Sequence, residues 1–332
     1  MQNAQKVLGF LARRQRYIIG IVILCLIMVA GLIGVEGFFS ITNFWSLLVL
    51  AAFLGLASFG QTFCALLGGL DLSIPFVIGT TNIGLASLLA HGQPPVLSIV
   101  FIIVFGVVFG CINGILSFRI QGQSLIISLG SGFAIAGGAQ ILTSIGSRFG
   151  GNVVYGVVPS WLVAFASMNG TIFGFHFPPV VLFWIIISVL TIVFVDNTWF
   201  GRNYYAIGGN RIAAARLSVS EFKVWVTAYG VSGGMAAITG VIFLGFSGGG
   251  FVGVGDPYLF MTVAAVVMGG TSLLGGWGGY GSTIIGVLIL TTLASLLVGL
   301  GLSYAAQQAV IGVLIVPMIV FYARSPHIRM QI

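Results

Sequence analysis

Few side chains in this sequence could carry out covalent or metal chemistry, and those few are scattered. His91, His176 and His327 lack the spacing of metal ligands. Lys6 and Lys223 are the only lysines, and neither completes a phosphate-binding pattern of G-x-x-x-x-G-K followed by Ser or Thr. We therefore expect no catalytic residue, no metal site and no cofactor in the chain, which argues against an enzyme.

A first candidate site is the segment from Gly68 to Pro75, whose sequence is GGLDLSIP. Paired glycines end a helix readily, Asp71 or Ser73 can cap the next helix, and Pro75 suits a first helical turn. An acid inside a membrane-spanning region is a functional candidate, so we predict a broken helix that lines a pore or is buried in protein. The alternative is that Asp71 only caps the following helix at the inner membrane surface. The residues assigned to this break are Gly68, Gly69, Asp71 and Ser73.

A second candidate is the connection 197–223, the most polar stretch in the sequence. Asn210 can cap a short helix whose middle is the three alanines 213–215. Such a small, rigid rod suits docking into the groove of a partner, and the alternative is an ordinary surface helix. The residues assigned to docking are Arg202, Gly208, Gly209, Asn210, Arg211, Ala213, Ala214, Ala215, Arg216 and Leu217.

The third candidate is the glycine-rich stretch 264–279, which contains Gly269, Gly270 and Thr271. Its glycines permit tight contact with a neighbouring helix or an interrupted span. We predict a helix break or a pore position at these three residues.

The composition identifies the surroundings of these segments. Of 332 residues, 58% are hydrophobic and 5% are charged, with a mean hydropathy of +1.17, whereas soluble domains are about a quarter charged. So few charges cannot cover a water-facing surface, and the apolar runs can cross about 30 Å of hydrocarbon repeatedly. The runs are unbroken and lack the alternation of barrel strands, which favours helices. We therefore predict an all-α, polytopic integral membrane protein.

About ten transmembrane helices are expected from the lengths of the apolar stretches. They cover roughly 17–36, 44–68, 72–90, 95–117, 123–145, 179–196, 224–246, 258–275, 280–300 and 303–323. Ten crossings place both termini on one side, and we expect residues 1–332 to form a single transmembrane domain.

The distribution of basic residues predicts which side that is. With the N-terminus inside, Arg148 is the only basic residue in an outer segment, so both termini are expected in the cytoplasm. The inner basic residues are Lys6, Arg13, Arg14, Arg16, Arg119, Arg202, Arg211, Arg216, Lys223, Arg324 and Arg329. Because these charges lie beside spans rather than in one patch, the net charge of +7 does not indicate nucleic-acid binding.

The three candidate segments together resemble the permeases of the ribose, xylose, arabinose and autoinducer-2 class of ABC importers. In that family the patterns G-G-(I/L/V)-D-L-S-V-G, A-x-G-G-N-x-x-A-A-x-x-x-G and A-A-V-V-x-G-G-T-S-x-x-G-G-x-G occur in this order. Residues 68–75, 206–219 and 264–278 follow the same order here.

The resemblance implies a permease subunit of an ATP-driven importer in the bacterial plasma membrane. Such a subunit would form half of a pore for a monosaccharide or similar small polar solute and would work by alternating access. The implied partners are a second permease copy or paralogue, ABC ATPase subunits that bind ATP and Mg²⁺, and an extracytoplasmic substrate-binding protein. The loop 202–220 would be the element that couples the permease to the ATPase.

The sequence departs from the family patterns at several positions. Ile74-Pro75 replaces Val-Gly, Ile212 stands where an acid is common, and Val219 stands where glycine is expected. The span that begins at Tyr258 also opens without an acidic residue. These departures leave the architecture intact.

Uncharged amides within the spans are the candidates for lining the pore. Such side chains either bond one helix to another or meet a polar solute, and we favour the bonding role for each. The candidates are Gln61, Asn82, Asn113, Gln140, Gln307 and Gln308.

Two alternatives remain from the sequence. One is a secondary transporter or channel that acts alone, although ion-coupled carriers usually hold acids or histidines at mid-membrane and here only Asp71 and Asp256 are near a span. The other keeps the ABC machinery and changes the solute to a nucleoside, riboflavin or a branched-chain amino acid.

Overall fold

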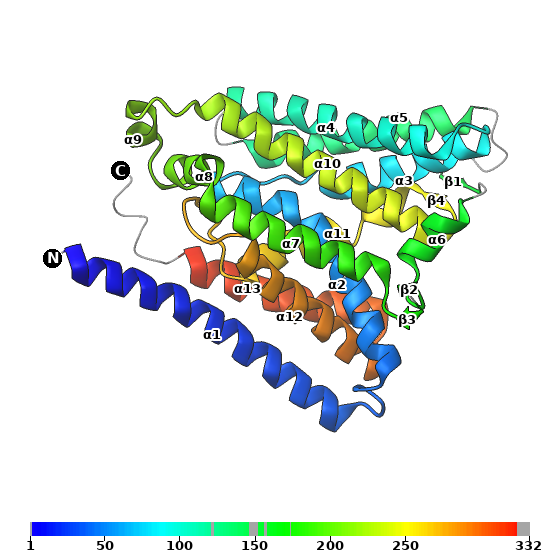
Figure 1. The fold of residues 1–332 in the computed structure, drawn as a ribbon, viewed down its shortest axis with the longest axis horizontal. Coiled ribbons are helices and arrows are strands. Elements are labelled where there is room, and N and C mark those ends of the chain that lie inside the picture. Colours follow the sequence, from blue (N-terminus) through cyan, green and yellow to red (C-terminus); the bar gives the residue numbers. More distant parts are fainter. Residues whose placement is uncertain (1, 121–122, 146–151, 156–157, 173, 324–332) are drawn as a thin grey trace.

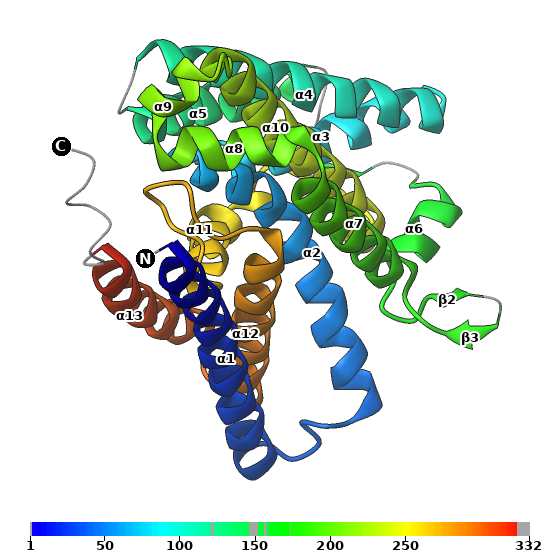
Figure 2. The same ribbon diagram turned by 60° about the vertical axis from the view of Figure 1, so that its left-hand side comes forward.

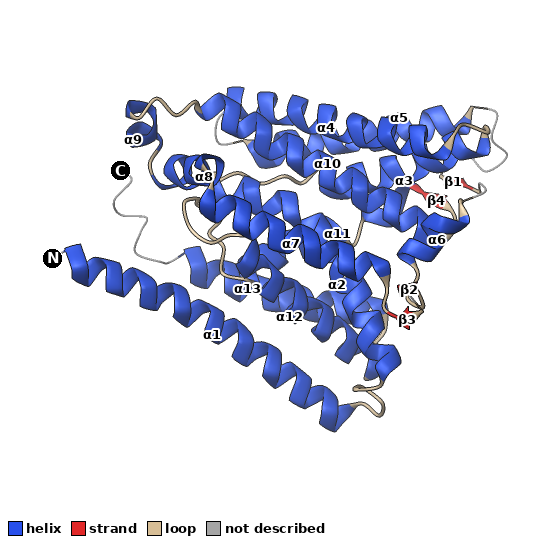
Figure 3. Cartoon of the chain, viewed as in Figure 1, coloured by secondary structure: helices blue, strands red, loops and turns tan. Residues whose placement is uncertain are grey.

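The chain is almost entirely helical in the computed structural model (Figure 1, Figure 3). The structure describes residues 2–120, 123–145, 152–155, 158–172 and 174–323, with side chains described between Tyr17 and Val313. The long helices are α1 (Gln2–Gly34), α2 (Ile41–Leu66), α3 (Ile74–Ala90), α4 (Pro95–Arg119), α5 (Ser124–Ser144), α7 (Pro179–Asn197), α10 (Glu221–Ser247), α12 (Tyr280–Gly299) and α13 (Tyr304–Ala323). The short ones are α6 (Ser160–Ala166), α8 (Trp199–Gly209), α9 (Arg211–Arg216), the 3-10 turn η1 (Val252–Gly255) and α11 (Tyr258–Met268).

Four strands of two residues each form two small antiparallel pairs. β1 (Val153–Val154) pairs with β4 (Gly250–Phe251), and β2 (Thr171–Ile172) pairs with β3 (Phe175–His176). Both pairs lie with α6 at one end of the helical bundle (Figure 1). The start of α1, the helices α8 and α9, and the end of α13 gather at the opposite end (Figure 1).

A helix is present in each of the ten expected spans, and the prediction of an all-α, polytopic membrane protein is confirmed. Within the described residues, seven helices are long and apolar enough to cross a membrane. They are α1 from Tyr17, α2, α4, α5, α7, α10 and α12. α3 has 17 residues and α11 has 11, while the side chains of α13 beyond Val313 and residues Arg148, Arg324 and Arg329 lie outside the described part.

The expected span 258–275 differs from the helix that is present. α11 ends at Met268, and at about 1.5 Å per residue its 11 residues are too short to cross the hydrocarbon alone. The chain before it, from β4 through η1, runs along α3: a Cβ on Gly255 would collide with the carbonyl of Pro75, and one on Gly79 with that of Val252. The expected span 258–275 is therefore not one continuous helix. The glycine-rich stretch follows α11, and the segment from β4 through η1 precedes it.

α10 lies at the centre of the bundle and packs against α2, α3 and α4. Figure 2 shows α1, α12 and α13 grouped on the opposite side of α2 and α11 from α4 and α5. This arrangement buries α2, α3 and α10 within the protein, while α4, α5 and the part of α1 from Tyr17 onward expose most of their apolar side chains.

Glycines at every fourth position of α4 allow it to approach α10 closely. A Cβ on Gly106 would lie 2.6 Å from the carbonyl oxygen of Gly233, and one on Gly114 would lie 3.0 Å from the Cβ of Tyr229. At Gly110 between them, a Cβ would collide with the carbonyl oxygen of Tyr229. Lipid is as apolar as these helices, so no hydrophobic force drives the helices together in the membrane. Close van der Waals packing therefore holds α4 and α10 together.

Replacing Gly110 by alanine tests this contact. We expect the Gly110→Ala variant to lose about 1–3 kcal/mol of stability, because the added methyl group meets backbone that cannot move without separating the helices. Thermal unfolding of the protein purified in detergent measures the loss.

Gly130 of α5 is the matched control, because a Cβ there has no neighbour within 4 Å. Gly130→Ala should hold or raise stability, since alanine favours a helix by up to about 1 kcal/mol over glycine. Equal unfolding midpoints for the two variants would contradict the packing account.

Candidate functional site

The three glycine-containing segments of the sequence meet at the C-terminal end of α2. The backbone N–H of Gly276 donates to the carbonyl oxygen of Leu66 at 2.9 Å. Gly208 of α8 lies so close that a Cβ there would collide with the same carbonyl oxygen of Leu66. Tyr205 of α8 donates its hydroxyl to the carbonyl oxygen of Gly278 at 2.8 Å. We call this meeting of 66–75, 199–219 and 269–279 the junction.

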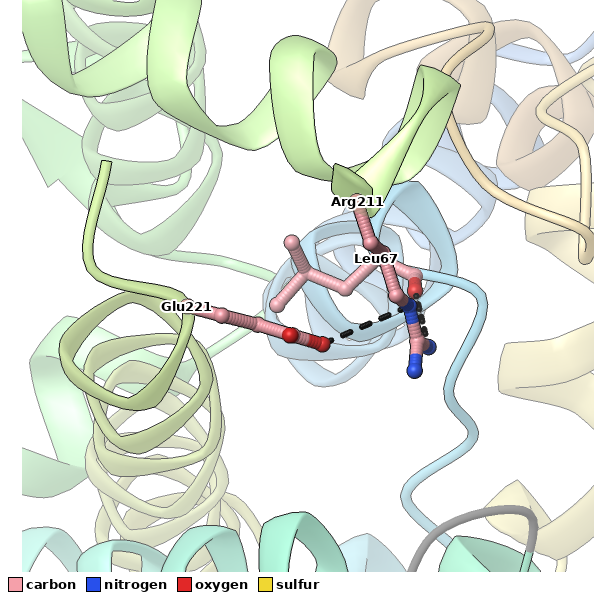
Figure 4. A network of polar contacts seen from close by, with 3 residues as sticks. All are labelled: Leu67, Arg211 and Glu221. Atoms are coloured by element: carbon pink, nitrogen blue, oxygen red, sulfur yellow. Dashed lines mark hydrogen bonds and ion pairs between the residues drawn. The ribbon is translucent and has the colours of Figure 1, made fainter. Parts of the chain in front are cut away.

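Arg211, at the start of α9, ties the junction together (Figure 4). Its Nη2 donates to the carbonyl oxygen of Leu67 at 3.4 Å, and its Nε lies 3.3 Å from Oε1 of Glu221 at the start of α10. The guanidinium carbon also lies 5.4 Å from the ring centroid of Trp225. The last carbonyls of a helix lack partners within the helix and carry partial negative charge, so an arginine suits the end of α2.

The prediction that Asn210 caps a short helix is confirmed. Its Oδ1 accepts a hydrogen bond from the N–H of Ala213 at 2.9 Å. At the other end of α9 the N–H of Val219 donates to the carbonyl of Ala214 at 3.1 Å, with Ser218 in the left-handed conformation at φ 59°. The residue in the backbone conformation that favours glycine is therefore Ser218, one position before Val219, where the family pattern has glycine.

One face of α9 is buried and the other is open. Ala214 is 2% exposed, whereas Ile212 is 71% and Leu217 is 74% exposed. The open face is therefore apolar, and it is flanked by the basic side chains of Arg211 and Arg216, which are also exposed.

The chain between α2 and α3 is irregular, and side chains from α2, α5 and α10 form hydrogen bonds with its backbone. The N–H of Asp71 donates to Oε1 of Gln61 at 3.2 Å, and the N–H of Leu72 donates to Oγ of Ser128 at 2.9 Å. The hydroxyl of Tyr229 donates to the carbonyl of Leu70 at 3.0 Å. Non-helical backbone at membrane depth is tolerated when it is paired in this way inside protein.

The carboxylate of Asp71 is the centre of a buried polar network. Its side chain is 1% exposed. Its Oδ1 accepts from the N–H of Ser73 at 3.0 Å and from Oγ of Ser73 at 2.6 Å, while Oδ2 accepts from Oγ of Ser232 on α10 at 2.7 Å. Short bonds to an ionised group are the stronger ones in a protein interior.

The network continues from Ser73 into α4 and α5. Nδ2 of Asn113 donates to Oγ of Ser73 at 3.0 Å, and Oγ of Ser131 donates to Oδ1 of Asn113 at 2.8 Å. Ser73 occupies the N-cap position of α3 but makes no side-chain capping bond. Asp71 therefore does not simply cap α3; it joins the start of α3 to α10, α4 and α5.

The other predicted amides divide into buried and exposed groups. Asn82 is buried and links α3 to two other elements, since its Nδ2 donates to the carbonyl of Gly240 at 3.1 Å and its Oδ1 accepts from the N–H of Phe251 at 2.8 Å. Gln140 is exposed on α5. Gln307 and Gln308 are partly exposed, and Nε2 of Gln307 donates to the carbonyl of Leu302 at 2.9 Å.

The glycine-rich stretch after α11 is built for tight turns. Thr271 accepts at Oγ1 from the N–H of Gly279 at 3.1 Å, and Gly270 has a φ of 91°. A Cβ on Gly269 would collide with the carbonyl of Ser282 on α12. These residues hold the junction close to α12.

Several residues that contact the junction were not singled out from the sequence. Ser232, Glu221, Trp225 and Tyr229 all lie on α10, yet they contact groups near Asp71 or Arg211. Serines and aromatic residues are common in spans, so their types alone carried no signal. Only the long-range fold brings them to the junction.

Comparison with known proteins identifies the family. Residues 43–319 match the family model described as the permease component of branched-chain amino acid transport systems. The chain belongs to this family, and the resemblance to ABC importer permeases based on the three segments is confirmed. It is a multi-pass permease subunit of the bacterial plasma membrane and not an enzyme.

The curated relatives are similar over most of their length. The ribose import permease protein RbsC of Bacillus subtilis (strain 168) is 35% identical over 79% of this chain and 78% of the relative. The probable ABC transporter permease protein YphD of Escherichia coli (strain K12) is 32% identical over 80% and 77%. The autoinducer 2 import system permease protein LsrD of Photorhabdus laumondii is 26% identical over 82% and 81%. No solved structure matches the chain.

Replacing Asp71 by asparagine tests the network. An amide offers one acceptor oxygen where the carboxylate offers two, so at least one of the serine donors loses its partner. We expect the Asp71→Asn variant to lose about 1–3 kcal/mol of stability and to lose solute uptake. Thermal unfolding in detergent and uptake by cells report the two effects.

Asp256 is the control, since it is an exposed acid near the start of α11. Asp256→Asn should change stability by no more than about 0.5 kcal/mol. The network would have no structural importance if both variants unfolded at the same temperature.

Proposed function

We propose that this chain forms half of the translocation pore of an ATP-driven importer for a monosaccharide or similar small polar solute. The observation that carries the proposal is the junction, where the three family segments converge on the end of α2. The names of the relatives, which include a ribose importer and an autoinducer 2 importer, support the solute class. ATP and Mg²⁺ would be bound by a separate ATPase subunit.

The coupling element in this proposal is α8 with α9. The exposed apolar side chains Ile212 and Leu217 would enter a groove of the ATPase. Movement of α9 would reach the end of α2 through Arg211 and through Gly208, which leaves no space between α8 and Leu66. The irregular segment around Asp71 joins α2 to α3, so a movement of α2 would be passed to α3. Tilting of these helices would open the pore first to one side of the membrane and then to the other, which is alternating access.

The orientation in this proposal has ten crossings with both termini in the cytoplasm. It is supported by the position of the start of α1, the end of α13 and the α8–α9 element at one end of the bundle (Figure 1). Basic residues lie near the helix termini on that same side of the bundle, as expected for a cytoplasmic face. They are Arg119, Arg202, Arg211, Arg216 and Lys223. The extracytoplasmic binding protein would meet the end that carries α6 and the short strands.

A second permease copy, or a paralogue, would complete the pore. A pore enclosed between two chains is lined by residues that are exposed on each chain alone. Gln140 meets this condition, and Gln307 and Gln308 meet it in part. We assign the buried Gln61, Asn82 and Asn113 to holding the helices.

Replacing Leu217 by aspartate tests the coupling assignment. We expect the Leu217→Asp variant to co-purify at least about tenfold less ATPase subunit, because losing one central apolar contact costs about 2 kcal/mol or more. The measurement is the ratio of ATPase to permease after affinity purification of the tagged permease.

Phe175→Asp is the matched control for this experiment. Phe175 is 79% exposed but lies on β3, at the opposite end of the bundle. Its substitution should leave the ratio unchanged. Undiminished co-purification of the Leu217 variant would remove α9 from the ATPase contact.

The main rival solute is a branched-chain amino acid, which the description of the matching family names; a nucleoside or riboflavin is less directly supported. We expect the cognate substrate-binding protein to bind pentoses or hexoses, measured by isothermal titration calorimetry with purified protein. Binding of leucine or a flavin, with no heat from sugars, would replace the sugar assignment and leave the coupling assignment intact.

A further inference from the structure

Two aromatic residues of α10 connect α9 to the chain just beyond the end of α2. The guanidinium carbon of Arg211 lies 5.4 Å from the ring centroid of Trp225, within the range of a cation–π contact. One helical turn further along α10, the ring of Tyr229 stacks on that of Trp225, with centroids 5.7 Å apart and ring planes 13° apart. The hydroxyl of Tyr229 donates to the carbonyl oxygen of Leu70 at 3.0 Å. We call Arg211, Trp225 and Tyr229 the column.

The two rings of the column have little freedom to move independently. Tyr229 is fully buried and Trp225 is 5% exposed. The backbone of Gly69 lies against both rings, since a Cβ there would be 2.9 Å from the hydroxyl oxygen of Tyr229 and 3.0 Å from the ring of Trp225. Buried side chains at this packing density do not change rotamer without displacing their neighbours. A displacement of one ring therefore displaces the other.

Leu70, at the far end of the column, is the first residue whose backbone has left α2. The N–H groups of Gly68 and Gly69 still bond to carbonyls of α2, and Gly68 has the positive φ, 77°, that is common after the end of a helix. The N–H of Leu70 instead donates to Oγ of Ser124 on α5 at 3.4 Å. The direction in which the chain continues toward Asp71 is therefore set at Leu70.

Arg211 contacts both sides of the place where α2 ends. On the α2 side its Nη2 donates directly to the carbonyl of Leu67 (Figure 4). On the far side the rest of the column reaches the carbonyl of Leu70. The ion pair with Glu221 holds the guanidinium between these two contacts, because Glu221 begins the helix that carries both rings. One side chain of α9 thus acts on the chain before and after the turn made by the two glycines.

We propose that Tyr229 is a positioning residue that sets the angle at which the chain leaves α2 for α3 according to the position of α9. The inference rests on the proposed coupling of α9 to an ATPase subunit, and it adds a second route, along α10, to the direct contact with α2. When α9 moves, Leu67 follows the guanidinium directly, whereas Leu70 is held from α10. The angle between α2 and α3 changes, and the segment around Asp71 moves with it.

The number of ATP molecules hydrolysed per solute molecule imported tests the proposal. The complete importer, with its ATPase and substrate-binding protein, is reconstituted in liposomes with radiolabelled ribose or leucine, whichever the wild type imports. Tyr229→Phe removes the hydroxyl and keeps the stacked ring. We expect this variant to retain its ATPase subunit and to hydrolyse at least about fivefold more ATP per solute, the equilibrium factor for one typical hydrogen bond.

Two substitutions of Trp225 test the stack separately. Trp225→Leu keeps an apolar side chain but removes the ring between Arg211 and Tyr229, so it should raise the ratio of ATP to solute as Tyr229→Phe does. Trp225→Phe keeps a ring in the column and should stay within about twofold of the wild type. Combining Trp225→Leu with Tyr229→Phe should add little to either change alone, because both interrupt one route. An unchanged ratio in Trp225→Leu would contradict transmission through the column.

Tyr280→Phe is the matched control for Tyr229→Phe. Tyr280 is also buried, at 4% exposed, and its hydroxyl donates to the carbonyl of Gly55 on α2 at 2.9 Å, about three turns before the end of that helix. This variant loses an equivalent hydrogen bond and should keep the wild-type ratio.

The outcomes separate this inference from the proposed function. A wild-type ratio in Tyr229→Phe, or a ratio raised equally in Tyr280→Phe, would overturn the positioning role and leave the import function intact. A wild type that imports neither ribose nor leucine would overturn the proposed function, and this inference with it.

Discussion

The carbonyl groups at the C-terminal end of α2 impose the constraint on which the junction depends. A helix that ends inside a protein leaves its last carbonyls without helical partners, and in surroundings without water each of them must find a donor. Leu66 takes the N–H of Gly276, and Leu67 takes the guanidinium of Arg211. Because the donors come from distant parts of the chain, the end of α2 cannot be satisfied unless the other two segments are in place.

The same constraint explains the polar residues that follow α2. The N–H groups of Gly68 and Gly69 still bond to carbonyls of α2, and Gln61, Ser128 and Tyr229 supply partners to the backbone that follows them. The carboxylate of Asp71 would be costly to bury alone, and its bonds to Ser73 and Ser232 offset that cost. A segment held at so many points moves only with the helices that hold it.

Local features of this fold were accessible from the sequence. Paired glycines before an acid and a proline predicted where α2 and α3 separate, and the spacing from Asn210 to the alanines predicted α9 with its cap. Both depend on residues that act within a few positions of one another. Apolar length likewise placed a helix in every expected span.

Features that depend on distant contacts were not accessible. Nothing near Ser232 indicates that it faces Asp71, which is 161 positions away. A glycine count also does not say which glycines turn the chain and which let helices touch: Gly270 has a positive φ, whereas Gly110 lies in a regular helix against the carbonyl of Tyr229. The sequence also did not indicate that Ser218, after α9, has a positive φ, because residues other than glycine rarely adopt that conformation.

The two faces of α9 explain how an element of six residues would transmit movement in the proposed importer. On its inner side Ala214 is small enough to be buried, and in the preceding helix Gly208 touches backbone with no side chain between them. A longer side chain at either position could change rotamer and absorb a displacement, whereas backbone in direct contact cannot. On the outer side Ile212 and Leu217 are largely exposed, so a partner could contact them. A rigid inner contact with an open outer face is therefore what the proposed coupling element requires, and in that proposal the basic side chains around α9 mark the cytoplasmic side of the membrane.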